Sequence, residues 1–189
     1  MVQIAVFVGT RGRGSNLRAI HDACSRGEVP ARVTLVVGTR PDSGAIEWAR
    51  EAGLPTVVVE PGEGYGPRLL DALKQAGVEW ICLAGYLRLL PAEVLQAFPN
   101  KVLNIHPALL PKHGGKGMYG MHVHEAVLAA GEDESGCTVH YVTERYDEGA
   151  PILQLRCPVF PGDTPESLAA RVLVLEHQAY PEALRRVLQ

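Results

Sequence analysis

The stretch EWICLAGYLRLLPAEVLQAFPNKVLNIH, residues 79–106, decides the fold because it contains two apolar runs joined by a short helical segment. The runs EWICLAG and VLNIH predict buried strands, and the helix between them is expected to open at Pro91 and Ala92. Near-continuous apolar strands joined by a helix are typical of a parallel sheet covered on both faces. This stretch therefore predicts the carboxyl half of a parallel sheet.

The same alternation of strand and helix precedes this stretch. The predicted strands are 3–8, 33–37 and 56–59, and the predicted helices are 16–26, 44–53 and 66–77. The pattern indicates an open, mostly parallel, twisted α/β sheet of Rossmann-like type with helices on both faces.

The alternation of predicted strands and helices ends after residue 130. A helix is predicted at 121–130, and GCTVHYVT (136–143) and PILQLRCPVF (151–160) predict an antiparallel strand pair near the C-terminal end of the sheet. A last helix is expected to start after Thr164 and run to the C-terminus. Pro181 lies inside this helix and is expected to bend or split it.

Composition and charge limit the class of protein. The chain has 189 residues, 47% hydrophobic and 21% charged, which predicts a single domain over 1–189. The formal net charge of −3 argues against a nucleic-acid partner. No apolar window approaches a membrane span and no signal peptide precedes the first strand, so we expect a cytoplasmic protein without membrane contact. The scattered cysteines, expected to be free thiols, are Cys24, Cys82, Cys137 and Cys157.

A glycine-rich loop, GTRGRGSNLRAI (9–20), follows the first strand. Its spacing is neither that of a dinucleotide-binding loop nor that of a Walker loop. Gly14, Ser15 and Asn16 lie at the mouth of a predicted helix, where free backbone N–H groups and the helix dipole favour an anion. The loop is predicted to bind a phosphate. The alternative is a strand-to-helix turn that only caps the N-terminus of the helix.

Asn104 and His106 are two residues apart in the strand VLNIH and should therefore share one face. An amide donor beside an imidazole suits acyl-type transfer, in which a carbonyl oxygen gains negative charge. The carboxylates that could hold the imidazole in its charged form are Glu144, Asp147 and Glu148, in the turn after the strand 136–143. No serine, cysteine or lysine is in a nucleophile setting, which favours direct transfer.

Two further sets of histidines are ambiguous from sequence alone. His140 could orient the turn that carries the carboxylates, or could be a half-buried strand residue bonded to backbone. His122 and His124 could suggest a metal site, but residues two apart on a helix do not share a face. We therefore expect no metal.

Five motifs in this order, GRGSNL, LAGYLRLLP, VLNIHPALLP, GCTVHYV and YDEGAPILQ, resemble the phosphoribosylglycinamide formyltransferase family (glycinamide ribonucleotide transformylases) over nearly the whole chain. The resemblance implies a formyltransferase fold and a folate-dependent enzyme of purine biosynthesis. Such an enzyme transfers a formyl group from 10-formyltetrahydrofolate, its co-substrate, to the amine of glycinamide ribonucleotide. The transfer is expected to be a direct attack through a tetrahedral intermediate.

The resemblance also implies roles for individual residues. Asn104 would bind the formyl oxygen, His106 would be the general acid, and Asp147 would keep His106 protonated. Glu176 would hold the substrate ribose, and Gly14, Ser15 and Asn16 its phosphate, which divides the chain into a ribonucleotide half (1–100) and a folate and catalytic half (101–189). The residues implied to contact the folate are Leu87, Arg88, Leu89, Leu90, Asn104, Thr143, Glu144, Arg145, Tyr146 and Asp147.

The chain departs from the family pattern at three places. Ala108 replaces the usual serine of HPSLLP, and Gly62 stands near the position of an arginine that reaches the folate or phosphate in some members, with Arg68 as a possible substitute. The segment GGKGMYG (114–120) is longer than in some members, and its glycines suggest a mobile flap. The assignments of Met121 and His122 near this flap stay open.

Other classes compete with this interpretation. Methionyl-tRNA formyltransferases normally add a basic C-terminal domain, formyltetrahydrofolate hydrolases an N-terminal one, and sugar-nucleotide formyltransferases lack GRGSNL. A dehydrogenase or other nucleotide-binding module would need the dinucleotide loop and an acidic ribose residue, neither of which is present. The expected partners are therefore the two small-molecule substrates, and the chain is expected to be a monomer or homodimer.

Overall fold

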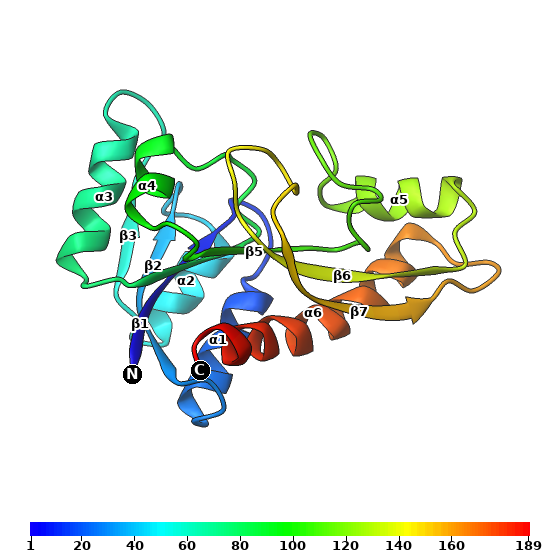
Figure 1. Cartoon of the computed structure of the whole chain (residues 1–189), viewed down its shortest axis with the longest axis horizontal. Coiled ribbons are helices and arrows are strands. Elements are labelled where there is room, and N and C mark those ends of the chain that lie inside the picture. Colours follow the sequence, from blue (N-terminus) through cyan, green and yellow to red (C-terminus); the bar gives the residue numbers. More distant parts are fainter.

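A computed structural model describes residues 1–189. Seven strands form one sheet in the order β3-β2-β1-β4-β5-β6-β7, flanked by six helices (Figure 1). In chain order the elements are β1 (Val2–Val8), α1 (Ser15–Ser25), β2 (Ala31–Gly38), α2 (Gly44–Glu51), β3 (Thr56–Val58), α3 (Tyr65–Gln75), β4 (Trp80–Ala84), α4 (Ala92–Ala97), β5 (Val102–His106), α5 (Met121–Ala129), β6 (Glu134–Tyr141), β7 (Pro151–Pro158) and α6 (Pro165–Val187).

The parallel part of the sheet is confirmed. β1 pairs with β2 on one side and β4 on the other, β2 pairs with β3, and β4 pairs with β5, all in parallel. The predicted antiparallel pair is β6 with β7. β6 also pairs antiparallel with β5, so the direction of the sheet changes next to the strand that carries Asn104 and His106.

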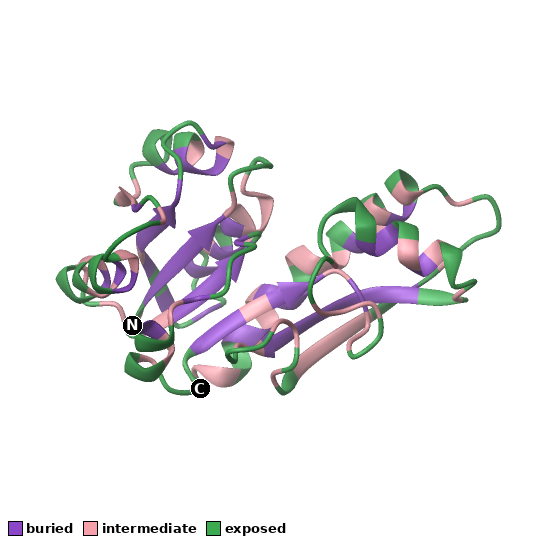
Figure 2. Ribbon diagram, turned by 90° about the horizontal axis from the view of Figure 1, so that it is seen from above, coloured by how far each residue is buried: buried purple, intermediate pink, exposed green.

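Helices cover both faces of the sheet, as predicted. Buried residues of α1, α2 and α6 share one core with Ile4, Val6, Leu103 and Ile105 of the strands. The alternate strand residues pack with α3 and α4 in a second core that includes Phe7. Burial is accordingly concentrated in the strands (Figure 2). Because Leu103 and Ile105 face the first core, Asn104 and His106 point to the other side of the sheet.

The expected split of the last helix at Pro181 is wrong, because α6 is continuous from Pro165 to Val187. Proline removes one backbone donor but does not by itself unwind a helix that is held by its packing. Ala179 and Tyr180 are fully buried next to it, and the Tyr180 hydroxyl lies 2.9 Å from the Leu83 carbonyl oxygen and 3.1 Å from that of Leu103. Ala183 and Leu184 are also fully buried in the core, so the helix is held on both sides of the proline. Neither α6 nor any other helix has the length and apolar character that crossing a membrane requires.

A buried polar network fixes the turn that follows β5. The Thr138 hydroxyl donates to the Ala108 carbonyl (2.7 Å) and accepts from the Leu110 N–H (3.1 Å). The Gln154 amide donates to the Leu110 carbonyl (2.9 Å) and to Thr138 (3.0 Å). Ala108 itself is completely buried, so this turn is held by β6 and β7 without a hydroxyl at position 108.

Candidate active site

The candidate site lies at the carboxyl edge of the parallel strands. The strand order runs outward in opposite directions from β1 and β4, which makes their boundary a topological switch point, the usual place of a ligand site in such sheets. The loops that follow the two strands touch there, since a Cβ atom added to Gly9 would overlap the Gly85 carbonyl oxygen. Glycine at position 9 is therefore required by the close approach of these loops.

The glycine loop leaves the N-terminus of α1 open. Gly14 is its N-cap residue with φ 72°, no side chain caps the helix, and its first turn has no acidic residue. The side-chain amide of Asn16 donates to Glu176 Oε1 over 3.2 Å, while its Oδ1 is buried without a partner. Free N–H groups together with an unsatisfied polar atom fit an anionic or hydroxyl-bearing ligand. The phosphate role of Gly14, Ser15 and Asn16 stays a prediction.

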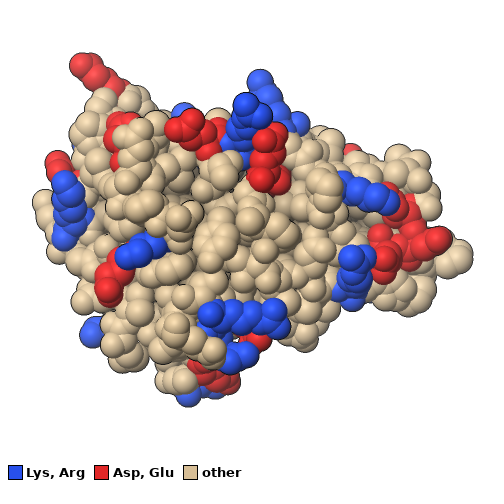
Figure 3. Space-filling model, viewed as in Figure 1, with Lys and Arg blue, Asp and Glu red and all other residues tan.

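The positive charge that the glycine loop (9–20) could offer to an anion comes from a few groups close to it. On the face shown in Figure 3, Lys and Arg are interspersed with Asp and Glu around a largely uncharged centre. Arg11 and Arg13 of the glycine loop are exposed. Positive potential for a phosphate therefore comes from the α1 N-terminus and these two side chains.

Glu176 reaches this region from α6, although it belongs to the other half of the chain. Burial raises the pKa of its carboxyl group to about 7, and the hydrogen bond from Asn16 opposes this rise only in part. Near neutral pH the group is thus divided between its neutral and charged forms. A neutral carboxyl can both donate and accept a hydrogen bond, which suits a hydroxyl of a sugar.

Asn104 is oriented by His140, its direct partner on the antiparallel strand β6. His140 Nδ1 lies 2.8 Å from the Tyr141 carbonyl oxygen and therefore carries a proton, which leaves Nε2 of the neutral ring as an acceptor. The Asn104 amide nitrogen lies 3.2 Å from that Nε2. One amide hydrogen of Asn104 is thus used by His140, and the second is available to a carbonyl oxygen.

His106 is buried, with 4% of its surface exposed, and it has one fixed proton. Its Nε2 lies 2.7 Å from the carbonyl oxygen of His113, so Nε2 is the donor. Its Nδ1 lies 3.5 Å from Asp147 Oδ2. Nδ1 is consequently the nitrogen that can exchange a proton with a substrate.

Asp147 is the carboxylate that the structure places beside His106, whereas the other two candidates, Glu144 and Glu148, are exposed. Asp147 has φ 57° and accepts a hydrogen bond from the Gly115 N–H over 3.0 Å. Burial alone would raise its pKa, but the neighbouring rings of His140 and His106 and the Gly115 N–H outweigh burial and lower it. Asp147 is therefore ionised at neutral pH.

The pKa of His106 is shifted in the direction opposite to the expected one. Burial lowers the pKa of His106 below its usual value, and the charge of Asp147 and the His113 carbonyl raise it only in part. Burial therefore opposes the protonated form of the ring, and the role of Asp147 in keeping His106 protonated stays a prediction. A proton is expected on Nδ1 only when further negative charge develops nearby.

The segments implied to contact folate lie next to each other. The Tyr146 hydroxyl donates to the Leu87 carbonyl over 3.1 Å and joins the 143–147 turn to the loop after β4. The side chains that this arrangement leaves exposed are Leu87, Arg88, Leu89, Thr143, Glu144 and Arg145. Leu90 differs, because its side chain is only 5% exposed and belongs to the core under α3 and α4.

Three other residues considered in the sequence do not join the site: Arg68 as an anion contact, and His122 and His124 as metal ligands. Arg68 donates to the carbonyls of Glu60 and Glu63 and so closes its own loop. His122 is exposed near Glu125, His124 is buried in α5, and no group of three or more residues could hold a metal ion.

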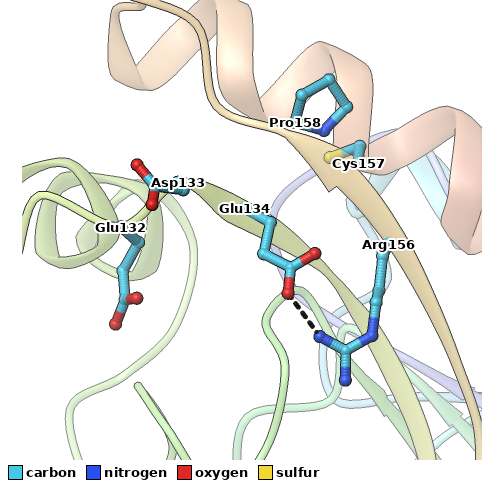
Figure 4. A pocket seen from close by; sticks show the side chains of 6 residues that line it. All are labelled: Glu132, Asp133, Glu134, Arg156, Cys157 and Pro158. Carbon is cyan, nitrogen blue, oxygen red and sulfur yellow. Dashed lines mark hydrogen bonds and ion pairs between the residues drawn. The ribbon is translucent and has the colours of Figure 1, made fainter.

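A separate hollow of about 520 Å³ lies at the far ends of β6 and β7 (Figure 4). Its Arg156 is already paired with Glu134 at 2.8 Å. The residues that line it are Glu132, Asp133, Glu134, Arg156, Cys157 and Pro158. It contains no unsatisfied polar group and none of the predicted site residues.

The comparisons with known proteins agree with this geometry. Residues 2–184 match the family described as formyl transferase. The chain belongs to the formyl transferase family. A phosphoribosylglycinamide formyltransferase of Haemophilus influenzae is 36% identical over 98% of this chain and 86% of its own length. The structure of glycinamide ribonucleotide transformylase 1 from Geobacillus kaustophilus superposes with a TM-score of 0.90 at 40% identity and covers 100% of both chains.

A plant relative extends beyond the matched region. The chloroplastic phosphoribosylglycinamide formyltransferase of Arabidopsis thaliana is 49% identical over 96% of this chain, but the chain spans only 64% of that protein. The resemblance to phosphoribosylglycinamide formyltransferases and the α/β fold predicted from the sequence are thus both confirmed. The roles of individual residues stay predictions.

Proposed function

We propose that this formyl transferase moves the formyl group of 10-formyltetrahydrofolate to the amine of glycinamide ribonucleotide, a step of purine biosynthesis. The single observation that supports this most strongly is the convergence of Asn104, His106 and Asp147 at the edge of the sheet that also carries the open N-terminus of α1. The names of the relatives at 36–49% identity point to the same reaction. The cytoplasmic location stays a prediction.

Each polar group at the edge has a distinct task in this proposal. Bound 10-formyltetrahydrofolate supplies the formyl carbonyl. The free amide hydrogen of Asn104 donates to the carbonyl oxygen as the amine attacks, and this donor strengthens as negative charge develops there. That charge also raises the pKa of His106, so its Nδ1 becomes protonated when it is needed. Asp147, already ionised, accepts the one proton that the amine loses and passes it to Nδ1 of His106. His106 then gives one proton to the folate nitrogen as the bond between that nitrogen and the formyl carbon breaks.

The two proposed halves of the chain are not independent. Residues 1–100 supply the phosphate loop, and residues 101–189 supply the catalytic side chains and the 143–147 turn. Glu176 belongs to the second half, yet its carboxyl contacts Asn16 of the first. We therefore assign the ribonucleotide to both halves and the folate to the 87–90 and 143–147 segments.

A direct assay tests the proposal. Enzyme, glycinamide ribonucleotide and formyl-folate are mixed, and the folate product is followed by absorbance. Formyl-folate loss that depends on the ribonucleotide supports the proposed acceptor. Loss at the same rate without the ribonucleotide would indicate hydrolysis, and loss only with methionyl-tRNA would indicate the other acceptor class.

Ser15→Ala is expected to raise the KM for glycinamide ribonucleotide roughly 10-fold or more, because a hydrogen bond to a charged group contributes about 1.5–3 kcal/mol. The KM for formyl-folate should change less than twofold. Ser25→Ala, at the other end of the same helix, is the matched control, because Ser25 only bonds the His21 carbonyl. Equal increases of both KM values would contradict the phosphate role.

Glu176→Gln is expected to change the pH dependence of ribonucleotide binding. Because the pKa of Glu176 is raised to about 7, the carboxyl is neutral below this pH and repels an anionic ligand above it. The wild-type KM divided by the variant KM should therefore increase roughly fivefold between about pH 6 and about pH 8, which corresponds to about 1 kcal/mol of charge repulsion. A ratio that is constant with pH would show that Glu176 does not titrate beside the ligand.

A further inference from the structure

We infer that Glu132, which lies between α5 and β6, is a positioning residue for His106. This inference rests on the proposed function. Glu132 contacts neither Asn104 nor the catalytic pair of His106 and Asp147. It holds the chain segment 112–115, which contacts both members of that pair.

The segment 112–115 touches the catalytic pair through its backbone. The His113 carbonyl accepts the Nε2 hydrogen of His106 over 2.7 Å, and the Gly115 N–H donates to Asp147 Oδ2 over 3.0 Å. Gly114 lies between them, and a Cβ atom there would be 3.3 Å from Cβ of Asp147. Two backbone groups, one on either side of Gly114, thus contact the two proposed catalytic side chains.

The backbone of His113 needs an external restraint to keep this geometry. Its φ of 56° is in the left-handed region, which is uncommon for a residue with a side chain and persists when surrounding contacts impose it. The restraint on its side chain is Glu132, since His113 Nε2 lies 3.1 Å from Glu132 Oε1. Lys112 Nζ lies 3.3 Å from the other carboxyl oxygen.

His113 therefore makes two separate contacts, one through its side chain and one through its backbone carbonyl. Its side chain is held by Glu132, and its carbonyl fixes the proton on Nε2 of His106. Because Nε2 is occupied, Nδ1, which lies 3.5 Å from Asp147 Oδ2, is the nitrogen left for proton transfer in the proposed reaction. The hydrogen bonds from His113 and Lys112 lower the pKa of Glu132, so the carboxylate that makes this contact is ionised at neutral pH.

Loss of the Glu132 contact should reduce turnover without weakening substrate binding. Glu132→Ala is expected to lower kcat roughly 10- to 100-fold, as for other losses of orientation at a reacting group, with both KM values within about twofold. Glu132→Gln keeps an oxygen that accepts from His113 and should retain kcat within about threefold. The matched control is Glu134→Ala, an exposed carboxylate paired with Arg156 at the far end of β6.

A double-mutant cycle tests whether Glu132 acts through His113. His113→Ala and Glu132→Ala should each lower kcat, and the double variant should be no slower than the slower single variant, because both remove the same contact. Multiplication of the two effects would overturn the inference. So would a kcat of Glu132→Ala equal to that of Glu134→Ala, or a change confined to KM.

The state of His106 provides a readout that does not depend on activity. The ¹⁵N shifts of its ring should show Nε2–H in the wild type and in Glu132→Gln, and a mixture of tautomers in Glu132→Ala. The charged or titratable groups that face His106 are Asp147, His140, His113 and His124, and they are unchanged in all three proteins. Unchanged ring shifts in a folded Glu132→Ala would overturn the inference. If the wild type fails the formyl-transfer assay, this measurement still decides the role of Glu132.

Discussion

Asn104→Ala is expected to lower kcat by roughly 10²–10³-fold while leaving the affinity for glycinamide ribonucleotide nearly unchanged. The reason is that Asn104 has one amide hydrogen fixed by His140 and a second that is free to meet an oxygen at the strand end. A donor of this kind contributes most when negative charge has developed on the oxygen. Its loss therefore affects the transition state more than substrate binding.

The measurement is steady-state kinetics of the variant with each substrate varied in turn. Gln96→Ala is a suitable control, because it also removes a side-chain amide, at an exposed position of α4. If Asn104→Ala weakened binding of the ribonucleotide and left kcat intact, Asn104 would be a binding residue and the proposed oxyanion role would be wrong.

Asp147→Asn is expected to reduce turnover by roughly 10²–10⁴-fold, the range of general acid–base catalysis. Asparagine can keep the left-handed backbone at position 147, and its side-chain oxygen can still accept from the Gly115 N–H. The substitution therefore removes mainly the charge. Because the carboxylate raises the pKa of His106, its loss lowers that pKa further.

The pH–rate profile checks the sign of this effect. Activity that needs a proton on His106 falls as the pH rises through the pKa of that residue. The alkaline limb of the profile should therefore move to lower pH in Asp147→Asn. Glu148→Gln, the same chemical change at the neighbouring exposed carboxylate, should leave the profile in place. A limb that does not move in Asp147→Asn would remove Asp147 from the proton transfer.

Much of the sheet could be predicted from the sequence, because buried strands and amphipathic helices leave periodic patterns. The strand VLNIH was predicted with the bounds that the structure gives it, 102–106. The strand expected at 136–143 instead spans 134–141, since its first residues are Glu134 and Ser135, whose polar side chains hide the start of the strand. The antiparallel pairing of β5 with β6 left no such pattern, because it depends on contacts between distant segments.

The site could be predicted only where side chains carry its chemistry. Asn104 and His106 were recognisable by residue type and spacing. These left Glu144, Asp147 and Glu148 as alternatives, and only the family resemblance singled out Asp147, which the structure places beside His106. The His113 carbonyl and the Gly115 N–H were not recognisable, because every residue except proline has both groups. The lowered pKa of His106 also could not be read from the sequence, since it results from a burial that outweighs the charge of Asp147.

The position of α6 in the chain has a consequence for biosynthesis on the ribosome. All seven strands and the three proposed catalytic side chains are translated before residue 165, but α6 supplies Glu176 and the fully buried Tyr180. A nascent chain without this segment would present the apolar side of β6 and β7 to water. Such an intermediate should be prone to associate with chaperones, and competence to capture the ribonucleotide should arise only once the final helix has docked.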